Sequence, residues 1–323
     1  MNWKLFPKVE LHLHLEGAAD PAFIRQLASE KSINISSIFD ENGAYKFDGF
    51  NAFLDIYEIA TQALKSPEDF KRLMQSVLEN LAEHNVVYAE TFISPDFCGG
   101  RDLGAWREYL MAMQEAHVEG VTLKGIVTCI RHLGPEIARG AALCAAETAG
   151  DWVVGFGMAG AENIGNAKDF SYAFDMAREA GLRLTSHAGE WCGAESVWET
   201  LKDLRVERIG HGVHSINDKE LVEYLAEMEI ALEVNPGSNV ALGVYPSWRD
   251  HPIQRLRDAG VKVTVSTDDP PFFNTTMTRE FEELEYTFGW GIEDFKLLNK
   301  TALDVAFCDV ATKEIITKRL EAS

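Results

Sequence analysis

The stretch VELHLHL at residues 9–15 alternates apolar side chains with His12 and His14. Alternation with a period of two is typical of a β-strand, and it places both imidazoles on the same face of that strand. Two histidines on one face of one segment can bind the same metal ion. The spacing also fits two hydrogen-bonded core histidines, because histidine is often partly buried. The stretch therefore predicts a strand and leaves these two functional interpretations open.

Seven further short apolar runs, rich in β-branched residues, follow this stretch along the chain. Amphipathic helical patterns lie between them, and alternation of strand and helix requires parallel pairing of the strands. Eight such units predict an α/β fold of the closed (β/α)8 barrel type, with a doubly wound open sheet as the alternative. The expected strands are residues 9–15, 86–93, 123–129, 152–156, 182–186, 208–210, 230–234 and 261–266. The expected helices are residues 22–30, 67–84, 106–119, 136–149, 167–180, 194–204, 218–227 and 251–259.

The 323-residue chain shows no internal repeat, no low-complexity tract and no linker rich in Pro, Gly and Ser. A barrel of this kind commonly forms one large domain, so we expect a single domain over residues 1–323. Residues 32–49 are loop-like and are expected to cross over the fold.

The charge balance argues against polyanionic partners. Lys and Arg total 30 against 51 Asp and Glu, a formal net charge of -21. Such a chain repels phosphate backbones and anionic lipid, so we expect neither nucleic acid nor a membrane as partner. No run of about 18 apolar residues and no signal-peptide pattern at the N-terminus are present, which makes the cytoplasm the expected location. The sequence indicates no oligomeric state.

Several familiar site types are excluded by their missing motifs. The five cysteines are far apart and never spaced as CxxC, which argues against a disulfide framework and against a cysteine zinc site. The patterns GxSxG, GxxxxGK[ST], HExxH and HxE with PCxxC are all absent. Gly155, Gly157 and Gly160 spell GxGxxG, but Gly165 interrupts the helix that a dinucleotide site requires.

Polar residues collect where the expected strands end, which in a (β/α)8 barrel is the mouth that carries the active site. His187 ends the fifth strand, and Asp268 with Asp269 ends the eighth. Together with His12 and His14, this predicts three nitrogens and an oxygen at one place. Such ligands suit Zn2+, one ion per chain, with Fe2+ and Mn2+ as alternatives.

Hydrolysis at such a metal also needs groups that move protons. His211 follows the sixth strand between two glycines, and Glu190 lies three residues beyond His187. Both are predicted to take part in catalysis. The alternatives are that His211 is a further metal ligand and that Glu190 only orients His187. His214 lies past the end of the sixth strand and is expected to be a surface group or an outer partner of the site. The remaining histidines are assigned no chemistry: His84, His117, His132 and His251.

Eight motifs in this order resemble those of the adenosine deaminases and related 6-aminopurine deaminases of the amidohydrolase superfamily. The similarity covers nearly the whole chain. The motifs are PKVELHLHLEGA (7–18), YAETFISP (88–95), CIRH (129–132), VVGFGMAGAE (153–162), TSHAGE (185–190), RIGHG (208–212), LEVNPGSN (232–239) and VSTDDP (265–270).

The resemblance implies a role for each matching residue. It implies a barrel of the TIM type whose zinc ligands are His12, His14, His187 and Asp268. It further implies that His211 contacts a metal-bound hydroxide which attacks purine C6, and that Glu190 protonates N1. Asp269 is implied to bond N7, and the backbone N–H of Gly160 to bond N3. The implied reaction converts adenosine or 2′-deoxyadenosine into the inosine product and ammonia, with a small-molecule purine as the partner.

One departure concerns the sugar end of the substrate. Many nucleoside deaminases of the family have Asp where this chain has Glu16, so free adenine or a modified nucleoside is the alternative substrate. The family also covers its site with inserted helices, and residues 50–64 occupy the matching place. Leu54 and Tyr57 are expected either to line this lid or to form a core-facing stripe at helical spacing.

Two more distant functions stay open at this point. A barrel hydrolase acting on a phosphoester or lactam would use the same metal without a proton donor to N1. A purine-binding or metal-storing protein would keep the site without turnover.

Overall fold

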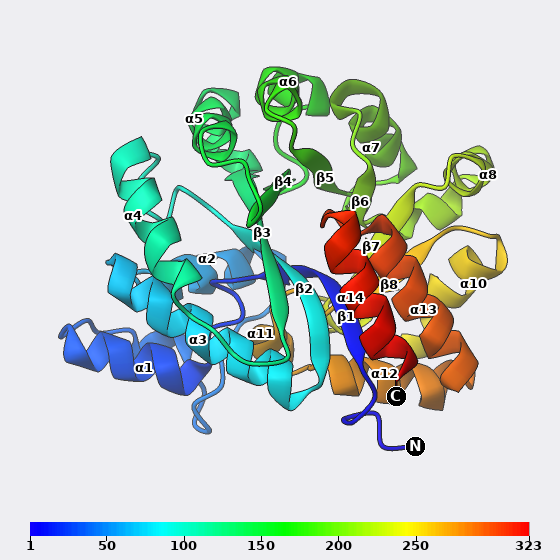
Figure 1. Cartoon of the computed structure of the whole chain (residues 1–323), viewed down its shortest axis with the longest axis horizontal. Helices are drawn as coiled ribbons and strands as arrows, with labels where there is room; N and C mark the ends of the chain where they lie inside the picture. Colours follow the sequence, from blue (N-terminus) through cyan, green and yellow to red (C-terminus); the bar gives the residue numbers. More distant parts are fainter. Residues whose placement is uncertain (323) are drawn as a thin grey trace.

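Eight parallel strands form one sheet in the order β1 to β8, as the computed structural model of residues 1–322 shows (Figure 1). The strands are β1 (Lys8–His14), β2 (Val86–Ile93), β3 (Thr122–Ile130), β4 (Val153–Ala159), β5 (Arg183–Ala188), β6 (Arg208–His211), β7 (Ala231–Val234) and β8 (Val263–Val265). Every strand of the sheet pairs in parallel with its neighbour in sequence. The predicted (β/α)8 barrel is confirmed, and the open doubly wound sheet is excluded.

The barrel closes between β1 and the segment that follows β8. The amide of His14 donates to the carbonyl of Asp268 over 3.0 Å, and the amide of Asp268 donates to the carbonyl of His12 over 3.1 Å. Leu13 and Asp268 form an isolated parallel bridge at the same point. Three of the residues that the sequence predicts as metal ligands, His12, His14 and Asp268, therefore also close the barrel.

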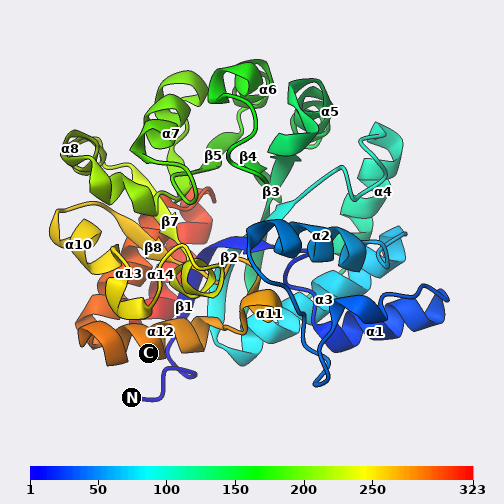
Figure 2. The ribbon, with the colours of Figure 1, turned by 180° about the vertical axis from the view of Figure 1, so that it is seen from behind.

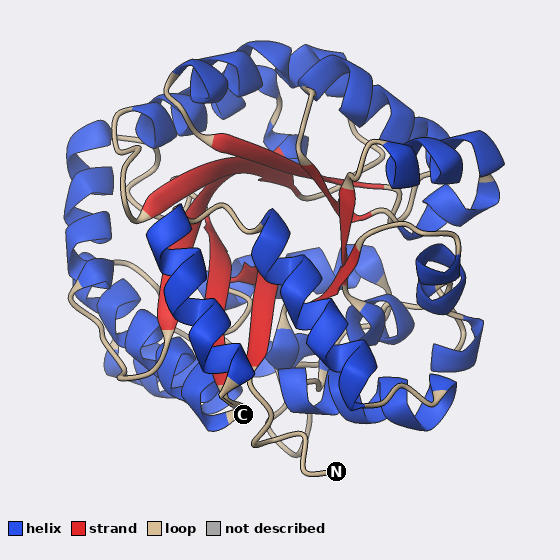
Figure 3. Cartoon of the chain, turned by 45° about the vertical axis from the view of Figure 1, so that its right-hand side comes forward, coloured by secondary structure: helices blue, strands red, loops and turns tan. Residues whose placement is uncertain are grey.

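Helices surround the strands as an outer ring (Figure 3). They are α1 (Pro21–Glu30), α2 (Phe50–Thr61), α3 (Pro67–Glu83), α4 (Leu103–Gln114), α5 (Pro135–Ala146), α6 (Ser171–Glu179), α7 (Ala194–Glu199), α8 (Lys219–Glu227), α9 (Pro236–Ala241), α10 (Ile253–Asp258), α11 (Pro270–Phe273), α12 (Met277–Phe288), α13 (Ile292–Val305) and α14 (Val310–Glu321). Within residues 1–322, none of them is long and apolar enough to cross a bilayer.

The eight expected strands all form, but several expected helix ends were wrong. The helix expected at 106–119 runs from Leu103 to Gln114, because the chain turns after Gln114 to reach β3. Residues 194–204 form α7 followed by a wider π-type turn, and residues 167–170 form a 3-10 turn ahead of α6. The helices α9 and α11 were not predicted, because they are too short to show a helical period. The helices α12 to α14 follow the last strand and were not predicted either.

The two ends of the barrel are closed differently. Figure 2 shows α2 and α11 on the near side of the strands, while α14 lies on the near side in Figure 1. At the strands' N-terminal ends, the Phe307 ring centre lies 3.5 Å from the guanidinium carbon of Arg208, the first residue of β6, and Phe307 packs from there against Phe92 and Ile126 inside the barrel. The strands' C-terminal ends form the mouth that carries the site, and α2 and α11 lie over that mouth (Figure 2).

Candidate metal centre and active site

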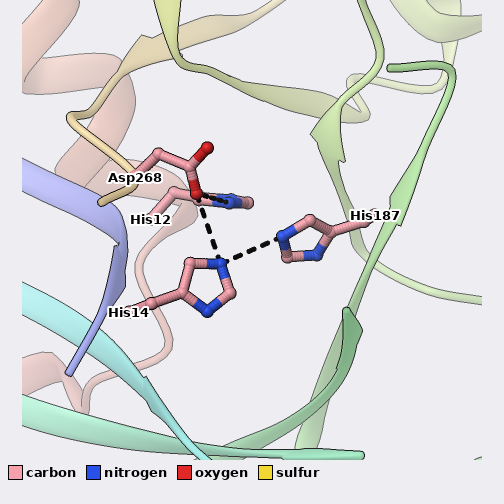
Figure 4. Close-up of side chains that lie close together, drawn as sticks. All are labelled: His12, His14, His187 and Asp268. Carbon is pink, nitrogen blue, oxygen red and sulfur yellow. Dashed lines mark hydrogen bonds and ion pairs between the residues drawn. The ribbon is translucent and has the colours of Figure 1, made fainter. Parts of the chain in front are cut away.

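Four side chains from β1, β5 and the segment after β8 converge at the mouth of the barrel (Figure 4). The Nε2 atoms of His14 and His187 lie 3.1 Å apart. Asp268 Oδ1 lies 3.4 Å from His12 Nε2 and 3.3 Å from His14 Nε2. One donor atom of each residue lies within 4.8 Å of one donor atom of every other. The structure thus brings together the four residues that the resemblance names as ligands.

The chemistry of these donors fits a cation. Ligand atoms about 2.0–2.1 Å from a tetrahedral zinc lie about 3.3 Å from one another, close to the separations between these atoms. Buried His12 Nε2 makes no hydrogen bond in the described part of the chain. Burial lowers the pKa of His14 and of His187, which favours the neutral form that metal binding requires. For His12, burial is outweighed by the hydrogen bonds and charges of Asp268 and Glu233, which raise its pKa to about 9, so a cation bound here would take the place of a proton on that ring. Burial works against ionised Asp268, but the neighbouring His12 and His14 hold its pKa well below the usual value.

A buried ionic chain fixes His12 from behind. His12 Nδ1 lies 2.8 Å from Glu233 Oε2, while Glu233 Oε1 accepts from Arg208 Nε at 2.6 Å and from Thr185 Oγ1 at 2.9 Å. Arg208 also donates to Glu90 at 2.7 Å. Burial alone would raise the pKa of Glu233, but Arg208 and His12 lower it to about 2. A carboxylate on the far ring nitrogen orients a ligating histidine and sets its tautomer.

An unusual backbone conformation is found at Asp268 and at one further residue of the site, His211. His211 and Asp268 have φ angles of 60° and 65°, in the left-handed region that residues with side chains rarely adopt. Such strain is typical of functional sites, where the surrounding structure must hold it. Ser238 Oγ donates to Asp268 Oδ2 at 2.7 Å, which occupies one carboxylate oxygen and leaves Oδ1 facing the histidines.

A hydrogen-bond relay determines the tautomer of His211. The amide of Ile253 can only donate, and it donates to His251 Nδ1 at 3.2 Å, so His251 carries its proton on Nε2. That proton goes to Asn239 Oδ1 at 3.1 Å, which leaves the Asn239 amide nitrogen to donate to His211 Nδ1 at 3.2 Å. Burial lowers the pKa of His211 to about 3, so the ring is neutral. Its one proton therefore lies on Nε2, 3.9 Å from Asp268 Oδ2.

Two more carboxyl groups are buried beside these residues. Glu190 Oε1 lies 3.6 Å from His211 Nδ1, and Glu190, His211 and Asp268 have donor atoms within 4.8 Å of one another. Burial and then the Asp268 charge hold the pKa values of Glu190 and Asp269 well above the usual range. Asp269 Oδ1 has no hydrogen-bond partner within residues 1–322. Glu190 thus lies beside His211 and Asp268.

The two expected lid residues, Leu54 and Tyr57, both lie on α2 and both pack, partly buried, against the hydrophobic core. The Tyr57 hydroxyl also lies 3.4 Å from Glu16 Oε2, and the Tyr57 ring stacks on Phe272 of α11 with ring centres 5.7 Å apart. Core packing is therefore observed for both residues, and Tyr57 in addition contacts Glu16. Gly160 has a φ of 99° at the end of β4, beside His132.

Several residues of the site escaped prediction. His251 was assigned no chemistry, yet it is buried in the relay to His211. Glu233 and Arg208 lie inside the quoted motifs without a role. The available signal was a charged residue inside an otherwise apolar strand, because burying such a residue is costly unless it is paired.

Fold and site define an α/β-barrel protein with a candidate metal centre of three histidines and an aspartate at the mouth. Residues 7–323 match the family described as "Adenosine deaminase", and the chain belongs to this family. Among its relatives, an adenine deaminase of Rhizobium johnstonii is 43% identical over 318 residues, which is 97% of this chain and 98% of that protein.

Solved structures of similar proteins have the same fold as this chain. The crystal structure of an adenine deaminase from Arthrobacter aurescens has a TM-score of 0.88 at 28% identity, covering 98% of each chain. An amidohydrolase from Burkholderia ambifaria with bound Zn has a TM-score of 0.85 at 26% identity, covering 99% of this chain and 94% of the other.

The buried ionic chain leads to a stability prediction. Replacing Arg208 by Met leaves Glu90 and Glu233 without their cation, and we expect the free energy of unfolding to fall by about 3–5 kcal/mol. Urea denaturation followed by circular dichroism measures this. The control Lys219→Met removes an ion pair with Glu223 whose lysine is 88% exposed, and it should cost less than about 1 kcal/mol. A loss below about 1 kcal/mol for Arg208→Met would contradict the paired role of this cation.

Proposed function

We propose that this protein catalyses the hydrolytic deamination of free adenine, in which adenine and water give hypoxanthine and ammonia. The proposal is carried by one observation: Asp268 belongs both to the cluster with the three histidines and to the cluster with Glu190 and His211, so a candidate metal centre lies directly beside two groups that can handle protons. The relative from Rhizobium johnstonii and the solved structure from Arthrobacter aurescens are both named adenine deaminase. Adenosine, which the resemblance implies first, is the second candidate because the family carries that name.

In this proposal His12, His14, His187 and Asp268 hold one Zn2+, with Fe2+ and Mn2+ as the alternatives. The fit of their donor atoms and the Zn of the Burkholderia ambifaria relative support zinc. A divalent cation bound there supplies Lewis acidity, which brings the pKa of a water close to neutrality. The first strand and the segment after the last strand close one barrel at this site, which supports one catalytic domain over residues 1–323.

Two side chains handle the protons. The relay from Ile253 leaves His211 with its proton on Nε2, directed at the space beside Asp268. We assign His211 the task of holding the oxygen of the attacking water. We assign Glu190 the task of giving a proton to N1 of the purine, which makes C6 more electrophilic as the water oxygen adds. Of the two protons of the water, one passes to the 6-amino group, which leaves C6 as ammonia, and the other restores Glu190 to its acid form, so the product keeps the proton on N1 and gains the C6 carbonyl.

The purine ring needs partners on its other edges. Among the residues that the structure describes, one buried carboxyl oxygen of Asp269 has no hydrogen-bond partner, and we assign it the hydrogen bond to N7. The backbone N–H of Gly160 is assigned to N3. A buried polar atom without a partner is costly, and bound substrate would remove that cost. These assignments would orient the ring so that C6 faces the metal centre.

The sugar end of the site favours the free base. Glu16 is 4% exposed and lies 3.4 Å from the Tyr57 hydroxyl and 3.5 Å from the amide of Ser94. The Glu16 side chain is one methylene longer than the Asp of many nucleoside deaminases. Tyr57, which contacts the Glu16 carboxylate, is stacked on Phe272. A ribose would have to displace these contacts, whereas adenine would not.

A comparison of substrates tests this choice. We expect kcat/KM, measured by ammonia release, to be at least about 100-fold higher for adenine than for adenosine or 2′-deoxyadenosine, because the sugar meets Tyr57 and Glu16. Equal or better turnover of adenosine would establish the second candidate. No turnover of any 6-aminopurine would reject the proposed class of reaction.

Replacing Glu190 by Gln tests the proton transfer. Glutamine cannot give a proton to N1, so we expect kcat to fall about 10²–10⁴-fold while bound metal stays the same. The control Glu195→Gln changes an exposed carboxylate in the same region and should leave kcat unchanged. Near-normal activity of Glu190→Gln would instead favour a hydrolase that needs no such donor.

Metal content tests the ligand set. We expect His12→Ala and Asp268→Ala to lose bound zinc on dialysis, because each removes one of four donors. Elemental analysis per chain measures this, and exposed His117→Ala should keep one metal. Full metal content in either ligand variant would overturn the assignment.

A further inference from the structure

The loop that carries Glu190 is held by one carboxylate that no step so far uses. Residues 189–192 join β5 to α7, and their four consecutive amides all donate to Glu162. The amide of Gly189 donates to Oε1, and the amides of Glu190, Trp191 and Cys192 donate to Oε2 at 3.1, 2.8 and 3.0 Å. The Ser196 hydroxyl adds a fifth bond to Oε1 at 2.6 Å.

Such an arrangement requires a charged carboxylate. Glu162 is 4% exposed, and burial alone would raise the pKa of its carboxyl group. The amides of Cys192, Trp191 and Gly189 and the Ser196 hydroxyl outweigh this and lower the pKa. Amides can only donate, and a carboxylate accepts at both oxygens without offering a proton. A glutamine of the same shape would point two N–H groups at these donors.

The segment that bears Glu162 is itself anchored. It follows β4, and Arg131 at the end of β3 donates to the carbonyls of Ile164 at 2.8 Å and Gly165 at 3.1 Å. The held loop is also tightly packed. Gly189 has a φ of 67°, and a Cβ there would lie 2.5 Å from Val197 Cγ2. The segment after β4 is therefore bonded to the end of β3 through Arg131 and to the loop after β5 through Glu162.

We propose that Glu162 is a positioning residue, whose carboxylate fixes the loop of residues 189–192 so that the carboxyl group of Glu190 reaches the purine ring. This inference rests on the proposed function, because it concerns the same reaction. The amide of Glu190 is itself one of the four bound amides, so loosening this loop moves the carboxyl group directly. A displacement of about 1 Å at a reacting group can cost about 100-fold in rate.

The test compares Glu162→Gln with wild-type protein, both loaded with metal. Hydrogen exchange followed by mass spectrometry should show the amides of residues 189–192 exchanging about tenfold faster or more, because each loses a charged acceptor. The kcat for adenine should fall about 100-fold. Bound metal should stay at one per chain, because the hydrogen bonds described for Glu162 go to residues 189–192 and Ser196, none of which is a proposed ligand.

Two variants keep the test decisive. Ser196→Ala removes one of the five bonds and should show the same effects at smaller size, even if Glu162→Gln fails to fold. Asp69→Asn changes another buried carboxylate that accepts a backbone amide, from Lys65 at 2.9 Å, and should leave loop exchange and kcat unchanged.

The outcomes separate the two ideas. Unchanged exchange in residues 189–192 and unchanged kcat in folded Glu162→Gln, with active wild-type protein, would overturn the inference alone. Wild-type protein that releases no ammonia from any 6-aminopurine would overturn the proposed function, whereas loop exchange would still report whether Glu162 holds the loop.

Discussion

The closure of the barrel between β1 and the end of β8 is the constraint on which the site depends. Two backbone hydrogen bonds join Asp268 to His12 and His14, so the contact that completes the sheet also sets three donor side chains side by side. His187 completes the group from β5 across the mouth. Because the barrel cannot close in another register without breaking these bonds, the arrangement of the donors is a direct product of the fold.

Buried side chains and backbone groups hold the reactive groups in place through hydrogen bonds and ion pairs. Glu233 and Arg208 orient His12, Ser238 occupies one oxygen of Asp268, and the relay from Ile253 orients His211. Glu233 in turn accepts from Thr185, and Arg208 in turn donates to Glu90. Polar networks of this kind are costly unless complete, and complete ones hold side chains rigidly, which supports catalysis by preorganised groups.

Much of this could be predicted from the sequence, and the remainder depends on contacts that a sequence does not display. The period-two spacing of His12 and His14 and the polar residues at strand ends predicted both the barrel and the residues that gather at its mouth. The ends of α4 and the short α9 were missed, because local periodicity does not mark where packing stops a helix. His251 and Glu162 were missed as site residues, because their importance lies in partners far away in the chain.

The central claim is that four donor atoms share one cation, and anomalous diffraction from a crystal of the metal-loaded protein tests it most directly. We predict a single strong peak at the metal absorption edge, within about 2.0–2.2 Å of His12, His14 and His187 nitrogens and an Asp268 oxygen. A peak bound by other residues, or no peak at the mouth of the barrel in protein that contains metal, would contradict the account.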